Sequence, residues 1–289
     1  MFIANAPCSW GIYFPTSNGY TPDQYLDQVA AAGFSGTELG PFGFLPKDAA
    51  SLDRALSARN LKLVGATHVH SLDDPASAPA LMATLGEIGP LLTVMGAPEL
   101  VLMDSGASYP QRGRGELDPQ AWRALTDMVS QARKFLFEDF GVHLTFHPHV
   151  ATAVETEAQI DRLLSDTDVE LCFDVGHHAA WDQDPVAYMH EVWDRIGYVH
   201  LKNVDGAVRA RVLSGELSMR DASDEGLFCP LPDGVVDIAA VLDLLRRRPF
   251  TGPVVVEQDL SEHAVETPAV LARRNADYLK SILNREMSA

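Results

Sequence analysis

Short apolar runs rich in β-branched residues alternate with longer amphipathic segments along the whole chain. The short runs predict eight strands, near residues 2–6, 35–39, 61–68, 98–103, 142–147, 169–174, 197–201 and 252–257. The longer segments predict eight helices, near residues 22–33, 47–59, 77–95, 118–140, 155–165, 184–195, 237–248 and 267–285. Thr21-Pro22 and Asp118-Pro119 are typical helix starts, because a capping side chain precedes a proline.

The order of these units predicts an α/β fold with a single (β/α)8 TIM barrel over residues 1–289, since no linker-like stretch divides the chain. An open, doubly wound sheet is the alternative. It is disfavoured because no glycine-rich phosphate loop follows a strand, and we expect no nucleotide cofactor for the same reason. The segment 204–236 has little regular pattern apart from a short helix near 215–222. Its place after the seventh strand predicts a lid over the active site.

Alternate residues of a barrel strand face the lumen and the helices, and catalytic groups lie at the carboxyl ends of the strands. In strand five, Val142, Leu144 and Phe146 form the helix-facing side, so His147 faces the lumen. The same count in four consecutive strands brings His147, Asp174, His200 and Glu257 to one mouth. Further rim candidates are Asn5, Trp10, Glu38, His68, His70, Asp104, His149 and Asp259. His143 lies deeper on strand five, and we expect it to be a buried, hydrogen-bonding core residue.

Two imidazoles and two carboxylates at one mouth favour a divalent metal with open positions for substrate oxygens. Manganese or cobalt suits these ligands, with zinc, iron or magnesium as alternatives. His149 stays open as the strand-five ligand instead of His147. A metal on adjacent carbonyl and hydroxyl oxygens acidifies the C–H between them and stabilises an enediolate. This chemistry serves dehydration, isomerisation and epimerisation of keto sugars. Taken singly, each residue could equally form a structural ion pair or cap a helix, and Trp10 could be a barrel plug or a platform for a sugar ring.

The net charge of −18 argues against a nucleic-acid or acidic-membrane partner, since both need a positive surface. The cysteines at positions 8, 172 and 229 are too few and too dispersed for a disulfide framework. The amino terminus lacks the pattern of a signal peptide, and every apolar run is cut short by Gly, Pro or charge. We therefore expect a cytoplasmic enzyme with a small-molecule substrate and no membrane contact.

Six segments carry a family resemblance. The chain resembles the xylose-isomerase-like TIM-barrel superfamily of sugar isomerases and epimerases, which includes the endonuclease IV type. Within it, the chain is most similar to the inosose (2-keto-myo-inositol) dehydratase group. The segments are NAPCSWG at 5–11, TELG at 37–40, FHPH at 146–149, FDVGH at 173–177, VHLKN at 199–203 and VEQD at 256–259.

The resemblance implies that Asp174, His200 and Glu257 are metal ligands and that His177 and Lys202 contact the substrate. Epimerases of the superfamily carry a glutamate where this chain has His147, which favours the dehydratase group. The chain departs from that group at Pro232-Asp233-Gly234, where the group tends to have Gly-x-Gly. Barrels of the superfamily often form dimers or tetramers, so a homo-oligomer is an open possibility by analogy.

The sequence therefore predicts a metal-dependent lyase that dehydrates a keto-cyclitol or keto-sugar through a metal-stabilised enediolate. General acid and base candidates are Glu38, His68, His177 and Lys202, with the pKa of Lys202 held near neutral by burial and the charge of the metal. The first alternative is a metal-dependent isomerase or epimerase of an unphosphorylated ketose. The second, from another class, is an abasic-site endonuclease, which the net charge disfavours.

Overall fold

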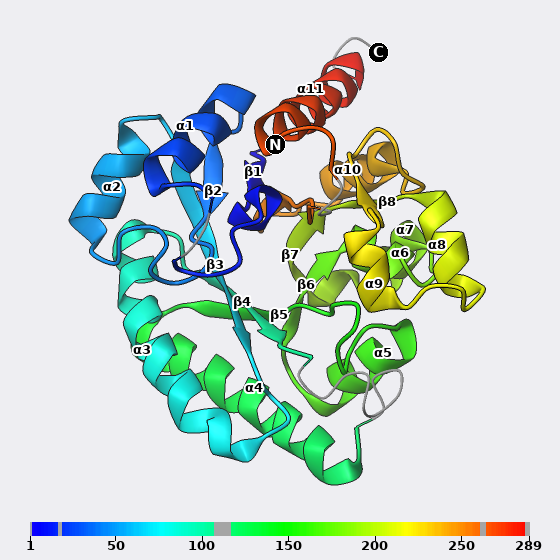
Figure 1. The fold of residues 1–289 in the computed structure, drawn as a ribbon. Helices are drawn as coiled ribbons and strands as arrows, with labels where there is room; N and C mark the ends of the chain where they lie inside the picture. Colours follow the sequence, from blue (N-terminus) through cyan, green and yellow to red (C-terminus); the bar gives the residue numbers. More distant parts are fainter. Residues whose placement is uncertain (1, 17–18, 107–116, 261–263, 287–289) are drawn as a thin grey trace.

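Eight parallel strands close into a barrel in the computed structural model, which describes residues 2–16, 19–106, 117–260 and 264–286. Around the barrel their order is β1-β10-β7-β6-β5-β4-β3-β2 (Figure 1). The strands are β1 (Ala4–Asn5), β2 (Gly36–Glu38), β3 (Lys62–His70), β4 (Glu99–Asp104), β5 (His143–Phe146), β6 (Glu170–Asp174), β7 (Ile196–Leu201) and β10 (Val254–Val256). The predicted α/β TIM barrel is confirmed, and the open sheet is wrong because β1 pairs with both β2 and β10.

Helices cover the outside of the barrel, and each of the predicted segments contains one (Figure 1). They are α1 (Pro22–Ala32), α2 (Ala49–Ser57), α3 (Ala78–Met95), α4 (Pro119–Phe140), α5 (Glu157–Asp166), α7 (Pro185–Glu191), α10 (Ile238–Arg247) and α11 (Pro268–Glu286). The Thr21 side chain accepts a hydrogen bond from the Gln24 amide, and the Asp118 side chain caps α4 in the same way. The predicted helix 184–195 is shorter in the structure, because a 3-10 turn, Trp193–Arg195, follows α7.

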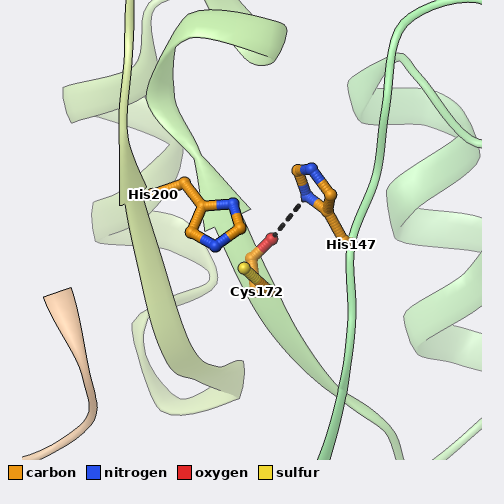
Figure 2. Close-up of side chains that lie close together, drawn as sticks. All are labelled: His147, Cys172 and His200. Atoms are coloured by element: carbon orange, nitrogen blue, oxygen red, sulfur yellow. Dashed lines mark hydrogen bonds between the residues drawn. The ribbon is translucent and has the colours of Figure 1, made fainter. Parts of the chain in front are cut away.

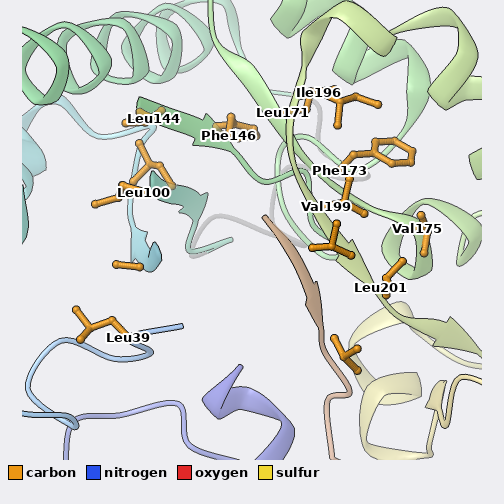
Figure 3. Close-up of a cluster of buried hydrophobic side chains, with 14 of the residues drawn as sticks. Leu39, Leu100, Leu144, Phe146, Leu171, Phe173, Val175, Ile196, Val199 and Leu201 are labelled. Atoms are coloured by element: carbon orange, nitrogen blue, oxygen red, sulfur yellow. The ribbon is translucent and has the colours of Figure 1, made fainter. Parts of the chain in front are cut away.

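Strand parity divides the buried side chains into two groups. Residues on the outer side of the strands pack against the helices, as Figure 3 shows for Leu144, Phe146, Phe173, Val199 and Leu201. The lumen holds a separate small cluster of Ala4, Ala6, Val101, Cys172, Tyr198 and Val255. The predicted lumen-facing and helix-facing positions of strands six to eight are confirmed.

His143 is a correction to the prediction. Its side chain is exposed and its ring lies 5.4 Å from that of Phe137 on α4. Parity gives the direction of a side chain but not its depth, and β5 begins at His143, at the opposite rim of the barrel from the site.

Helix α3 is unusually apolar. With the turn before it, Pro75–Met95 is long and apolar enough to resemble a membrane span by composition, which the sequence analysis did not anticipate. In the structure, α3 contacts α2 and α4 and buries Leu81, Leu85 and Leu92 in the core. It therefore forms part of the outer layer of the barrel.

The segment 204–236 is more ordered than predicted. It contains α8 (Gly206–Leu213), α9 (Met219–Asp224) and β9 (Phe228–Cys229), which pairs antiparallel with β8 (Asn203–Val204). The Asn203 side chain holds the end of the segment, because its amide bonds the Leu231 and Val236 backbone. The role of this segment as a lid stays a prediction.

Candidate metal centre

The four predicted ligands converge at the carboxyl end of the barrel. His147 follows β5, Asp174 ends β6, His200 lies in β7 and Glu257 follows β10, and none is more than 7 % exposed. Ligand atoms of His147, Asp174, His177 and Glu257 all lie within 4.8 Å of one another. This spacing is consistent with a divalent metal site made of buried nitrogen and oxygen donors.

His200 joins the same cluster from the side. Its Nδ1 lies 3.3 Å from Glu257 Oε2 and 3.8 Å from Asp174 Oδ2. Five side chains therefore offer ligand atoms, and His177 is as close to the centre as the ligands predicted from the sequence.

Three atoms of the four ligands predicted from the sequence have no hydrogen-bond partner among the described residues. They are His147 Nε2, Asp174 Oδ2 and His200 Nδ1. Buried polar atoms without partners are destabilising and rare, so each needs an explanation. A metal ion would satisfy all three at once, and their mixed nitrogen and oxygen chemistry fits manganese, cobalt, zinc or iron.

The second nitrogen of each imidazole is fixed by a hydrogen bond, which turns the free nitrogen toward the centre. His147 Nδ1 donates to the Cys172 carbonyl oxygen at 3.4 Å (Figure 2). His200 Nε2 lies 3.0 Å from Glu38 Oε1. In Figure 2 the two rings lie on either side of Cys172.

The two carboxylate oxygens of Asp174 have different roles: Oδ1 caps a helix, and Oδ2 faces the other ligands. Its Oδ1 accepts hydrogen bonds from the Gly176 and His177 amides, at 2.7 and 3.0 Å, and so caps the short helix α6 (Val175–Ala179). This helix was not predicted from the sequence, and it turns His177 back toward the ligands. The signal was present, because aspartate is a preferred residue before a helix.

Glu38 is saturated by donors in the lumen. Its Oε1 accepts from the Tyr198 hydroxyl at 2.8 Å as well as from His200, and its Oε2 accepts from the Thr67 hydroxyl at 2.7 Å. The side chain is 1 % exposed. Tyr198 and Thr67 were not among the predicted site residues, although Tyr198 lies in the lumen two residues before His200. This environment favours a carboxylate that orients His200 over one that exchanges a proton with a substrate.

Lys202 lies among acidic groups. Its Nζ donates to His177 Nε2 at 2.8 Å and to Asp259 Oδ2 at 3.0 Å, and it lies 3.1 Å from Glu257 Oε2. Burial alone lowers the pKa of this ammonium, but Asp174 and its neighbours outweigh burial and raise the pKa well above the ordinary value. The near-neutral pKa predicted for Lys202 therefore does not arise from the protein's own groups.

The histidines differ in their protonation. Burial lowers the pKa of His147 and of His177 well below the ordinary value, so both are neutral. His147 keeps the lone pair of Nε2 for a metal, whereas the lone pair of His177 Nε2 accepts from Lys202. Burial also opposes charge on His200, but Cys172 and Glu257 outweigh it and raise its pKa. A bound metal would replace that proton, which makes metal affinity dependent on pH.

Rim residues of β3, β4 and β5 lie around this centre with different partners. His70 Nε2 lies 3.0 Å from the Ser77 carbonyl oxygen, and Asp104 accepts from the Leu72 and Gly106 amides. His149 Nδ1 donates to the Val150 carbonyl oxygen, and its ring lies 3.8 Å from that of His177.

Two predicted residues of the amino-terminal region are held by local contacts. Trp10 packs edge-on against Tyr25 and donates its Nε1–H to Gln28 of α1, so its indole belongs to the core. Asn5 accepts from the Ala6 amide, and its Nδ2 has no partner among the described residues.

A cavity of about 420 Å³ opens beside the cluster. Glu38, His68 and Glu257 line its inner end, together with Cys8. Burial lowers the pKa of His68 to about 4, and its Nε2 has no partner among the described residues. Burial raises the pKa of the Cys8 thiol, which keeps it protonated and a poor nucleophile.

Known proteins similar to this chain share its fold and much of its length. It is 35% identical to the rhizopine catabolism protein MocC of Rhizobium meliloti, over 89% of this chain and 81% of that protein. It is 29% identical to the inosose dehydratase of Geobacillus kaustophilus, over 99% and 96%. Among solved structures, the IOLI protein with a bound zinc atom aligns with a TM-score of 0.71 at 14% identity, covering 99% of both chains. L-ribulose 3-epimerase aligns with a TM-score of 0.70 at 16% identity, covering 99% of this chain and 95% of that one.

The family comparison agrees with the geometry. The profile of the xylose isomerase-like TIM barrels matches residues 26–282, which include β2 to β10 and every ligand of the cluster. The profile covers most of the chain, and the structure has the closed barrel with a buried histidine and carboxylate cluster at its carboxyl end. The chain therefore belongs to the xylose isomerase-like TIM-barrel family of sugar isomerases and dehydratases.

Proposed function

We propose that this protein is a metal-dependent lyase that removes water from a keto-cyclitol or keto-sugar. The observation that carries the proposal is a set of three ligand atoms, on His147, Asp174 and His200, that have no hydrogen-bond partner among the described residues and lie beside a cavity lined by Glu257. The inosose dehydratases similar to the chain over 90% or more of its length support this reaction rather than another of the family.

His147, Asp174, His200 and Glu257 would hold a divalent metal. The zinc in the related IOLI structure shows that this fold can hold such an ion. Manganese and cobalt fit the same donors. When bound, the ion supplies Lewis-acid polarisation of a carbonyl oxygen, which acidifies the neighbouring C–H.

The chain's own residues move the protons. His68 is neutral and lines the cavity with a free Nε2, so it is our candidate for the base that removes the C–H proton. His177 accepts a hydrogen bond from Lys202 at Nε2, so its Nδ1 carries the proton. It can pass that proton to the departing hydroxyl while Lys202 replaces it.

A proton NMR time course with an inosose tests the reaction. Protein stripped with a chelator should be inactive, and manganese, cobalt or zinc should restore loss of water. His147→Ala should lose metal binding and turnover, while His143→Ala, on the exposed end of the same strand, should keep both. Full activity after chelation would refute the metal mechanism, and a product of unchanged mass would identify an isomerase or epimerase instead.

A further inference from the structure

The cavity beside the metal centre extends well beyond the reacting end. From Glu38, His68 and Glu257 it runs outward to Thr84 and Glu87 on α3. Its volume of about 420 Å³ falls in the range of roughly 300–1,000 Å³ typical of pockets that bury drug-sized ligands. Such ligands are larger than one sugar ring.

The outer part of the cavity is lined mainly by apolar side chains. They are Ile12, Tyr13, Pro15, Pro41, Phe42 and Val69. A cyclitol ring carries hydroxyl groups on nearly every carbon, so it would leave this wall without matching contacts. An aromatic or aliphatic group would instead bury apolar surface there.

Two of these residues also form an exposed apolar rim. Tyr13, which follows η1 (Pro7–Trp10), is 48% exposed, and Val69, within β3, is 46% exposed. Exposed apolar groups gathered around an opening commonly mark a binding site.

A charged pair supports the far wall. Lys47 Nζ lies 4.2 Å from the centre of the Phe42 ring and 3.3 Å from Glu87 Oε2. Both side chains of the ion pair are more than half exposed, so the pair itself contributes little energy, but Lys47 links the Phe42 ring to α3. An aromatic wall favours a flat apolar group over a polar one.

We infer that the outer cavity is a subsite for a substituent, so that the substrate is a keto-cyclitol or keto-sugar ring bearing an aryl or alkyl ether or glycosidic group. The ring lies at the metal end and the substituent contacts Tyr13, Phe42 and Val69. This inference rests on the proposed function for the identity of the ring. The subsite itself rests on the continuity of the cavity with the metal centre.

Binding without turnover tests the subsite first. Calorimetry on the metal-loaded protein compares an inositol with its phenyl ether, neither of which can react. The ether should bind about tenfold more tightly, the effect of roughly 1.4 kcal/mol of apolar and aromatic contact. Tyr13→Ala should remove most of that preference and leave inositol binding unchanged. Phe14→Ala is the matched control, because Phe14 is an adjacent aromatic residue, 70% exposed, that does not line the cavity.

Turnover then separates the two proposals. The kcat/KM for an inosose that carries a phenyl ether remote from the reacting carbons should exceed that for free inosose, and Tyr13→Ala should equalise them. Equal binding of the two inositols, or a preference that survives Tyr13→Ala, overturns the subsite. If Tyr13→Ala dissociates an oligomer but keeps the preference for the ether, the rim is an interface between copies of the chain and the subsite is overturned. Tight binding of the ether without turnover of either inosose refutes the proposed reaction alone.

Discussion

Replacing Glu38 by glutamine tests whether this carboxylate orients a metal ligand or transfers a proton. The carboxylate accepts from His200, Tyr198 and Thr67 at distances between 2.7 and 3.0 Å. Glutamine keeps the shape but turns one acceptor oxygen into a donor. The Thr67 hydroxyl can accept as well as donate, so it can receive the new amide, but the negative charge opposite His200 is lost.

The expected loss of stability follows from that lost charge. A hydrogen bond to a charged group contributes about 1.5–3 kcal/mol and one to a neutral group about 0.5–1.5 kcal/mol, so Glu38→Gln should be less stable by about 1–2 kcal/mol. In a chain of this size, that corresponds to a fall in Tm of very roughly 2–8 °C. Metal affinity should fall about 10- to 100-fold, the usual effect of removing the carboxylate behind a metal-bound histidine.

Calorimetric titration with zinc and thermal unfolding measure the two effects. Glu87→Gln is the control, since Glu87 is an exposed glutamate at the far end of the cavity and should change neither quantity. Tyr198→Phe should lower stability by about 1 kcal/mol, because it removes one donor and leaves no group mispaired. If Glu38→Gln binds zinc as tightly as the wild type but loses turnover by a factor of about a hundred or more, Glu38 is a general acid or base and our reasoning is wrong.

Three other substitutions probe different parts of the barrel. Burial, with the nearby Glu170, raises the pKa of Glu99 to about 7, so the wild-type protein should lose stability as pH rises from about 4.5 to 7. In urea unfolding, Glu99→Gln should be more stable than the wild type at pH 8 by at most about 3 kcal/mol, and equally stable at pH 4. An equal advantage at both pH values would contradict this. Lys202→Met leaves Asp174, Glu257 and Asp259 without their cation, so the free energy of unfolding of the metal-free protein should fall by about 3–5 kcal/mol. Added zinc should then raise the Tm of this variant more than that of the wild type. An equal rise in both would count against the cluster as the metal site. Gly234→Ala places a methyl group against Asn203 Oδ1, and we expect a loss of about 1–3 kcal/mol in the free energy of unfolding. Gly19→Ala, with open space around it, should change stability little.

The positions of the ligands were predictable because they depend on two simple periodicities. The repeat of strand and helix gave the barrel, and the two-residue period of the strands sent Cys172 and Asp174 inward and Phe173 outward. Each strand end then followed from where its apolar run stopped. Both periodicities involve only neighbouring residues, so they can be read directly from the sequence.

What could not be predicted depends on contacts between distant residues or on very short elements. The pairing of Glu38 with Tyr198 joins residues 160 positions apart, and no pattern in either strand signals it. Helix α6 has five residues, too few for a helical period to show. The exposure of His143 depends on how far the barrel extends below β5, which the apolar run does not record.

The order of strands around the barrel also determines when the metal centre can form during synthesis of the chain. Glu257 follows β10, which inserts between β1 and β7, whereas His147, Asp174 and His200 come from three strands that are adjacent both in sequence and in the sheet. A chain emerging from the ribosome can assemble those three donors while the ring is still open. It gains the last carboxylate only when β10, the last strand to be made, pairs with β7, so tight capture of the ion should report that this last strand has joined the sheet.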